Sequence, residues 1–139
     1  MKAILINIGV FFAALIVGGM VNMGLVIAGP MLIASPNGVD VTDIASIAAS
    51  IHLFEIKHFV FPFLTHAVGT LVGAVLAYKF AFKYRKAMAY LVGGVFLLGG
   101  IANTFMIPAP TWFVVLDLLA AYIPMAWLGI QISQVSQTN

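Results

Sequence analysis

The residues best suited to chemistry gather in one stretch, HLFEIKHFVFPFLTH at residues 52–66, which holds all three histidines of the chain. Glu55 and His58 are three residues apart, a spacing that places a carboxylate and an imidazole on one helix face, as in carboxylate-bridged metal sites. His52 precedes Glu55 by the same spacing. On an ideal helix these three residues and His66 form one stripe about 120° wide.

A metal site is therefore one hypothesis for this stripe. Imidazole and carboxylate ligands suit zinc, copper or iron, and nothing in the sequence selects among these divalent transition metals. At a rise of about 1.5 Å per residue, His52 and His66 are about 21 Å apart along the helix, so one ion cannot contact both. The candidate metal ligands are His52, Glu55 and His58, and the alternative is that they are interfacial side chains in a wet vestibule.

The rest of the chain is too apolar for a soluble domain. Of its 139 residues, 63% are hydrophobic and 7% are charged, and the mean hydropathy is +1.15. This composition leaves too little polar surface to face water, so we expect an integral membrane protein whose partner is the lipid bilayer. The six basic residues then report orientation, and we expect no nucleic acid partner. Cysteine is absent, which excludes disulfides and thiol nucleophiles.

Four windows of the sequence are long enough to cross a membrane, for which a helix needs about 20 apolar residues. They lie at about residues 3–30, 57–80, 87–107 and 111–132. The expected fold class is all-α: an integral membrane four-helix bundle that forms a single transmembrane domain over residues 1–139. The turn signal SPNG at residues 35–38 predicts a short outer helix or loop between the first and second spans.

Positive charges set the expected orientation. Apart from Lys57, lysine and arginine stand near the N-terminus and between the second and third spans, at Lys2, Lys79, Lys83, Arg85 and Lys86. By the positive-inside rule both termini and the second loop are cytoplasmic. All four acidic residues and all three histidines then fall in the outer half of the protein, so we expect any chemistry to face outward.

Each expected span contributes one polar side chain at a similar depth in that outer half. An ionisable residue inside a span costs roughly 2.5–3.5 kcal/mol on insertion scales and marks a functional site by default. Small residues share a helix face with each of these side chains, and such faces are where membrane helices approach closely. We therefore expect a pocket formed by Asn22, His66, Asn103, Asp117 and Tyr122.

Three functions remain open for this pocket. In the first, which we favour, the protein binds or transports a small molecule, a lipid or an ion, and a homo-oligomer is expected because four short helices enclose little volume. In the second, the protein is a membrane metalloprotein or metalloenzyme. In the third, His66 and Asp117 pair with Asn22, Asn103 or Tyr122 only to join helices, and the protein is a structural module.

Whether the protein is an enzyme stays open. The sequence contains no recognised nucleophile motif, phosphate loop or zinc-protease motif. General acid and base chemistry would depend on four residues, Glu55, His58, His66 and Asp117.

Two segments, HLFEIKHFVFPFLTHAVGTLVGA and ANTFMIPAPTWFVVLDLLAAYIPMAWLG, resemble a group of small four-span bacterial membrane proteins of uncharacterised function. The likeness covers nearly the whole chain. It implies a location in the bacterial inner membrane, and it implies no reaction, substrate or site residue because the group has no established activity.

Overall fold

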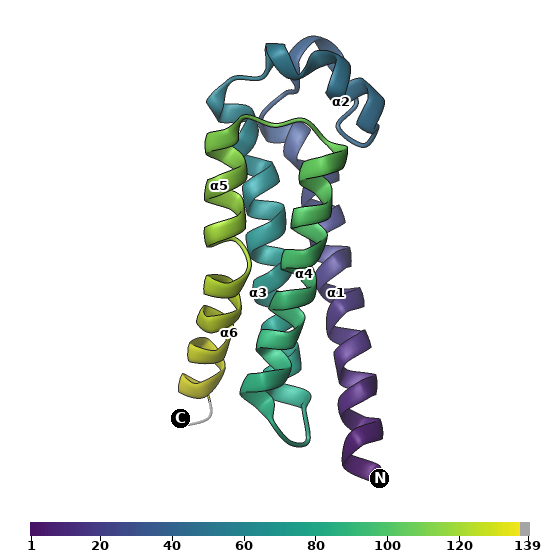
Figure 1. The fold of residues 1–139 in the computed structure, drawn as a ribbon, viewed down its shortest axis with the longest axis vertical. Coiled ribbons are helices and arrows are strands. Elements are labelled where there is room, and N and C mark those ends of the chain that lie inside the picture. The colour runs from purple at the N-terminus through teal and green to yellow at the C-terminus, as the bar shows by residue number, and fades with distance from the viewer. Residues whose placement is uncertain (137–139) are drawn as a thin grey trace.

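The described part of the chain, residues 1–136 without the side chain of Asn37, is all-helical in a computed structural model (Figure 1). Four helical segments are long and apolar enough to cross a membrane. They are α1 (Lys2–Leu32), the short 3-10 helix η3 with α3 (Ile56–Phe59 and Val60–Phe80), α4 (Arg85–Met106), and α5 with α6 (Thr111–Ala120 and Ile123–Val135). The all-α class is confirmed, and the four predicted spans coincide with these four helical segments.

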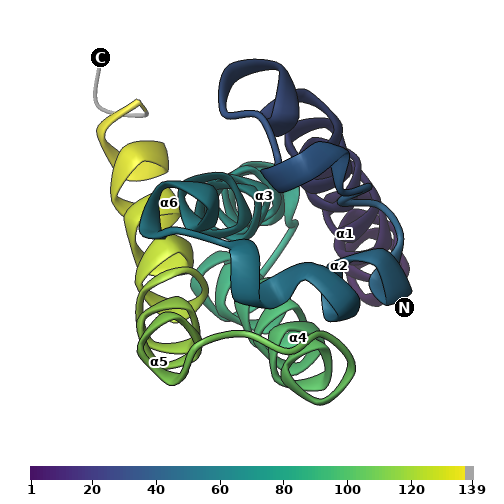
Figure 2. The same ribbon diagram turned by 90° about the horizontal axis from the view of Figure 1, so that it is seen from above.

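Helix α3 is the central element of the bundle. It packs against α1, α4 and α6, whereas α1 and α4 contact each other only slightly. Figure 2 shows α3 with α1 on one side, α6 on the other and α4 beside it. Residues on α3 can therefore meet side chains from every other long helix.

The segment between α1 and α3 folds over one end of the bundle (Figure 1). It contains η1 (Pro36–Gly38), α2 (Ile44–Ser50) and η2 (Ile51–Leu53), and with η3 we call residues 36–59 the cap. Asp43 begins α2, because its carboxylate accepts the backbone N–H of Ser46 at 2.9 Å and of Ala45 at 3.3 Å. The predicted short helix lies here, and its outer placement stays a prediction.

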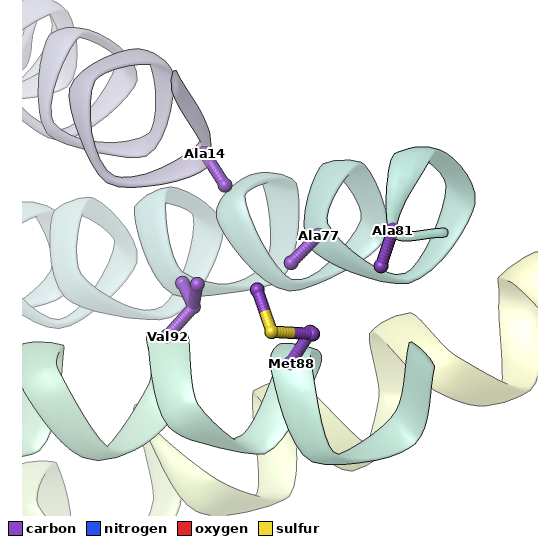
Figure 3. Close-up of a cluster of buried hydrophobic side chains, with 5 residues drawn as sticks. All are labelled: Ala14, Ala77, Ala81, Met88 and Val92. Atoms are coloured by element: carbon purple, nitrogen blue, oxygen red, sulfur yellow. The ribbon is translucent and has the colours of Figure 1, made fainter. Parts of the chain in front are cut away.

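The opposite half of the bundle is closely packed. Ala14 of α1, Ala77 of α3, and Met88 and Val92 of α4 are buried against one another with Ala81 (Figure 3). Small side chains let membrane helices approach closely. In this half of the molecule the helices are therefore close together, with these side chains between them.

The loop between α3 and α4 is fixed to α1 at this packed end. The side-chain amide of Asn7 donates to the carbonyl of Lys83 at 2.9 Å, and its oxygen accepts the backbone N–H of Phe82 at 2.9 Å. Tyr84 has a left-handed φ of 57°, which reverses the chain into α4. The start of α1 and the end of α6 also lie at this end of the bundle (Figure 1).

Large apolar side chains cover the outer faces of the long helices. Phe105 is 85% exposed and Leu119 is 71% exposed, and α1 exposes a series of isoleucine, phenylalanine and methionine side chains. Backbone polar groups inside a helix are satisfied internally, which is what hydrocarbon requires. The four apolar helices therefore indicate a membrane-embedded protein in contact with lipid.

Candidate functional site

Three side chains meet in the interior of the bundle: His66 of α3, Asp117 of α5 and Tyr122 at the start of α6. Nδ1 of His66 lies 2.9 Å from Oδ2 and 3.0 Å from Oδ1 of Asp117. The hydroxyl of Tyr122 donates to Oδ2 at 3.0 Å, and its ring stacks on the His66 ring with centroids 5.6 Å apart. The Asp117 and Tyr122 side chains are buried, and that of His66 is 19% exposed.

A break between α5 and α6 creates the Asp117–Tyr122 contact. In a continuous helix two residues five positions apart point about 140° away from each other, so these side chains would not meet. Helix α5 ends at Ala120, and Pro124 lies in the first turn of α6. Proline has no backbone N–H, and its ring clashes with the carbonyl four residues earlier, so it kinks or breaks a helix. The backbone leaves helical geometry at Tyr122, and the Tyr122 side chain can therefore reach the Asp117 carboxylate.

Helix α4 leaves room for the Tyr122 ring at Gly100. A Cβ atom on Gly100 would overlap the Tyr122 hydroxyl, whereas one on the neighbouring Gly99 would meet nothing within 4 Å. Both glycines are small residues of the kind that permits close packing of membrane helices. The contact of Gly100 with the site is not readable from the sequence, because its partner is set by the break between α5 and α6.

A cavity of about 360 Å³ lies between α1, α3, α4 and α5, beneath the cap. Most of its walls are apolar, including Met23, Val26, Phe59, Phe113 and Val114. Its volume is at the lower end of the range for small-molecule sites, about 300–1,000 Å³. The structure therefore contains a largely apolar chamber at the capped end of the bundle.

The ionisable pair lies at the end of the chamber farthest from the cap. His66 and Asp117 are the deepest lining residues that α3 and α5 contribute, and Asn22 and Gly100 are the deepest from α1 and α4. Asn103 of α4 also lines the wall. The chamber thus has apolar walls and a polar floor.

Four of the five predicted pocket residues line this cavity, and the fifth, Tyr122, contacts it through Asp117. Asn22 is half-buried and Asn103 is exposed. Among the residues that the structure describes, neither amide has a hydrogen-bond partner, and Nε2 of His66 has none. Of the three predicted partners for the His66–Asp117 pair, Tyr122 is the one that forms a hydrogen bond.

The cap contributes further polar lining residues, Thr42 and His58. The hydroxyl and the backbone N–H of Thr42, a lining residue, donate to Oδ1 of Asp40 at 2.6 Å and 2.8 Å. These hydrogen bonds from Thr42 lower the pKa of the Asp40 carboxyl. The turn that precedes α2 is thereby held in place over the chamber.

The predicted helical stripe through His52, Glu55 and His58 is wrong. His52 lies in η2, which ends at Leu53, and Glu55 has an extended backbone with φ −90° and ψ 167° before η3 begins. The stripe requires one continuous helix over residues 52–66. The chain instead changes direction between His52 and His58, so the helical spacing does not apply.

Local contacts explain the residue types in this stretch. Nδ1 of His58 accepts the backbone N–H of Glu55 at 2.8 Å, which fixes the start of η3. The Glu55 carboxylate pairs with Lys57 at 3.1 Å on the surface. In residues 1–136 no group of three or more histidine, aspartate or glutamate residues is placed to hold a metal ion. The metal site stays a prediction without support from this geometry.

The arrangement at the cavity floor is suited to binding a polar group or exchanging a proton. A carboxylate on one ring nitrogen orients a histidine and leaves the other nitrogen available to a second molecule. In comparisons with known proteins, no protein-family model, no curated protein and no solved structure matches the chain. The functional argument therefore depends on this geometry.

Proposed function

We propose that the protein binds a small, mainly apolar molecule in the capped cavity, and that His66 anchors the polar group of that molecule. One observation carries the proposal: a hydrogen-bonded imidazole and carboxylate form the floor of an apolar chamber, and Nε2 of His66 has no partner among residues 1–136. Apolar walls with a few convergent polar groups are typical of small-molecule sites.

The energetic cost of these side chains supports a binding role. Placing a charged residue such as aspartate inside a span costs roughly 2.5–3.5 kcal/mol on insertion scales, whereas a hydrogen bond between membrane helices contributes about 1 kcal/mol. The bonds to His66 and Tyr122 offset only part of that cost. A purely structural pair is therefore the weaker explanation.

Binding fits the packing better than transport does. The cavity occupies the capped half of the bundle, and the other half is filled by the core around Ala14, Ala77 and Val92 (Figure 3). A transported molecule would need a path through that core. Residues of one chain line the cavity on four helices and the cap, so binding does not depend on a homo-oligomer, which stays a prediction.

The charge distribution supports an outward-facing cavity. Lys79, Lys83, Arg85 and Lys86 lie at or next to the loop between α3 and α4, at the end of the bundle opposite the cap. The positive-inside rule assigns that end to the cytoplasm, together with both termini. The resemblance to small bacterial membrane proteins supports the inner membrane as the location.

A thermal-shift experiment tests the binding role. Delipidated protein is titrated with a total lipid extract of the expressing cells, and the melting temperature is recorded. The wild type is expected to be stabilised, because a ligand that binds only the folded state raises the melting temperature. Val114→Trp, which fills the cavity wall, should abolish the rise.

Val115→Trp is the matched control, because Val115 is the next residue of α5 and points away from the protein with 51% exposure. It should keep the wild-type response. If the melting temperatures of the wild type, Val114→Trp and Val115→Trp rose equally, lipid would be acting as a general solvent for the protein. That result would contradict the proposal.

A further inference from the structure

The hydrogen bonds around Asp117 constrain where protons lie. The hydroxyl of Tyr122 donates to the carboxyl group. Nδ1 of His66 faces both carboxyl oxygens, at 2.9 Å and 3.0 Å, so one proton must lie between the ring and the carboxyl group. Whichever of the two groups holds this proton, Nε2 is the ring nitrogen that remains for the cavity.

Electrostatics determine whether Nε2 also carries a proton. The elements packed around the pair present only neutral groups to it: Asn22 from α1, Asn103 from α4 and the Tyr122 hydroxyl from α6. Of the basic side chains, Lys57 pairs with Glu55 at the surface, and the other five lie toward the opposite end of the bundle. No lysine or arginine offsets the charge of Asp117.

The pair therefore has to balance its own charge. With the shared proton alone it would carry a net negative charge, which is costly away from water. A second proton on Nε2 makes the pair neutral overall, either as imidazolium with carboxylate or as imidazole with carboxylic acid. In that neutral pair, Nε2 of His66 is a hydrogen-bond donor.

We infer that the ligand is an apolar molecule that carries a neutral hydrogen-bond acceptor of the carbonyl type, which Nε2–H of His66 binds; the inference rests on the proposed function. An Nε2–H group that faces this largely apolar cavity has no partner among residues 1–136, and an acceptor on the ligand supplies a hydrogen bond that a hydrocarbon cannot. No unpaired lysine or arginine lines the cavity, so an anionic acceptor would add a charge that nothing there offsets.

The neighbouring amides are compatible with this class of ligand. The side chains of Asn22 and Asn103 line the same cavity, and each amide offers both donors and an acceptor. They can assist a carbonyl compound but do not select for one. A second imidazole, that of His58, lines the capped end of the cavity. At the floor, His66 is the residue that discriminates between ligands with and without an acceptor.

Two isosteric probes test the inference in nanodiscs: undecan-2-one, a ketone, and 2-methylundec-1-ene, in which a methylene group replaces the carbonyl oxygen. Dissociation constants are expressed as mole fractions of probe in the lipid, so that different partitioning of the two probes between water and lipid does not affect the comparison. The wild type should bind the ketone about fivefold to tenfold more tightly, as expected for one hydrogen bond. His66→Phe should remove this preference, and His52→Phe, a change outside the cavity, should keep it.

The outcomes separate this inference from the proposed function. If both probes bind equally and Val114→Trp blocks both, the cavity binds ligands but the acceptor preference is wrong. If neither probe binds and the lipid extract gives no shift, the proposed function fails and the inference falls with it.

Nitrogen-15 NMR of histidine-labelled protein tests the donor state without any ligand. At neutral pH, Nε2 of His66 is expected to carry a directly bonded hydrogen, and its signal should vanish in His66→Gln but persist in His52→Gln. An unprotonated Nε2 would overturn the inference whatever the probes show.

Discussion

At the scale of single residues, Asp117 organises the site. Its carboxyl group accepts from Tyr122 and faces Nδ1 of His66, and it is buried. The pairing could be predicted from sequence because two ionisable residues in apolar spans have few partners other than each other. Asn22 and Asn103 were also predicted as pocket residues, and both line the cavity. Whether they also bond to His66 or Asp117 stayed open, because that depends on helix rotation.

Removing the Tyr122 hydroxyl should destabilise the protein modestly. We expect Tyr122→Phe to lower the free energy of unfolding by about 1 kcal/mol, the value typical of hydrogen bonds between membrane helices. Unfolding in mixed micelles measures this change. Tyr90→Phe is the control, because Tyr90 is partly exposed on α4 and its hydroxyl has no partner among residues 1–136.

A double-mutant cycle makes the same prediction more specific. In an Asp117→Leu background the acceptor is gone, so Tyr122→Phe should cost clearly less than it does in the wild type. Equal costs in both backgrounds would mean that the hydroxyl does not bond to Asp117.

At the scale of elements, the spans were predictable and one local break was not. Length and hydropathy located the four helices, since those properties are summed over about 20 residues. The interruption at Tyr122, ahead of Pro124, is of the kind that a proline predicts. The unpredicted break is at Glu55, where the chain leaves helical geometry and His58 accepts the backbone N–H. Such local contacts are invisible to a periodicity that assumes an ideal helix.

The fit between α4 and the start of α6 predicts opposite effects for two adjacent glycines. Gly100→Ala should lower the free energy of unfolding by about 1–3 kcal/mol, as overpacking does, because its Cβ overlaps the Tyr122 hydroxyl. Gly99→Ala should leave stability unchanged or raise it by up to about 1 kcal/mol through helix propensity, since nothing lies within 4 Å of its Cβ.

The same pair of variants tests the position of Tyr122. Unfolding in mixed micelles provides both values, and Gly100→Ala should also weaken the stabilisation by lipid extract. A Gly100→Ala protein as stable as Gly99→Ala would show that the Tyr122 ring does not occupy this space.

At the scale of the whole molecule, the cap and the bundle together form the binding chamber. Apolar composition predicted the membrane and the helices, but the cavity depends on how residues 36–59 fold over α1, α3, α4 and α5. That arrangement arises from contacts between distant parts of the chain. It could not be predicted from one sequence.

The proposed orientation can be measured in a chain that has no native cysteine. Ala49→Cys places a thiol on exposed α2, and Ala87→Cys places one on an exposed position near the start of α4. A membrane-impermeant maleimide applied to spheroplasts should label the first and spare the second until the cells are lysed. The reverse pattern would place the cap in the cytoplasm.

The central claim, that the cavity above His66 and Asp117 holds a small molecule, is tested most directly by native mass spectrometry of protein released gently from its membrane. The wild type and Val115→Trp are expected to carry one bound molecule of a few hundred daltons, in keeping with a cavity of about 360 Å³, and Val114→Trp should lack it. Wild-type protein without an adduct, or an adduct retained in full by Val114→Trp, would contradict the account.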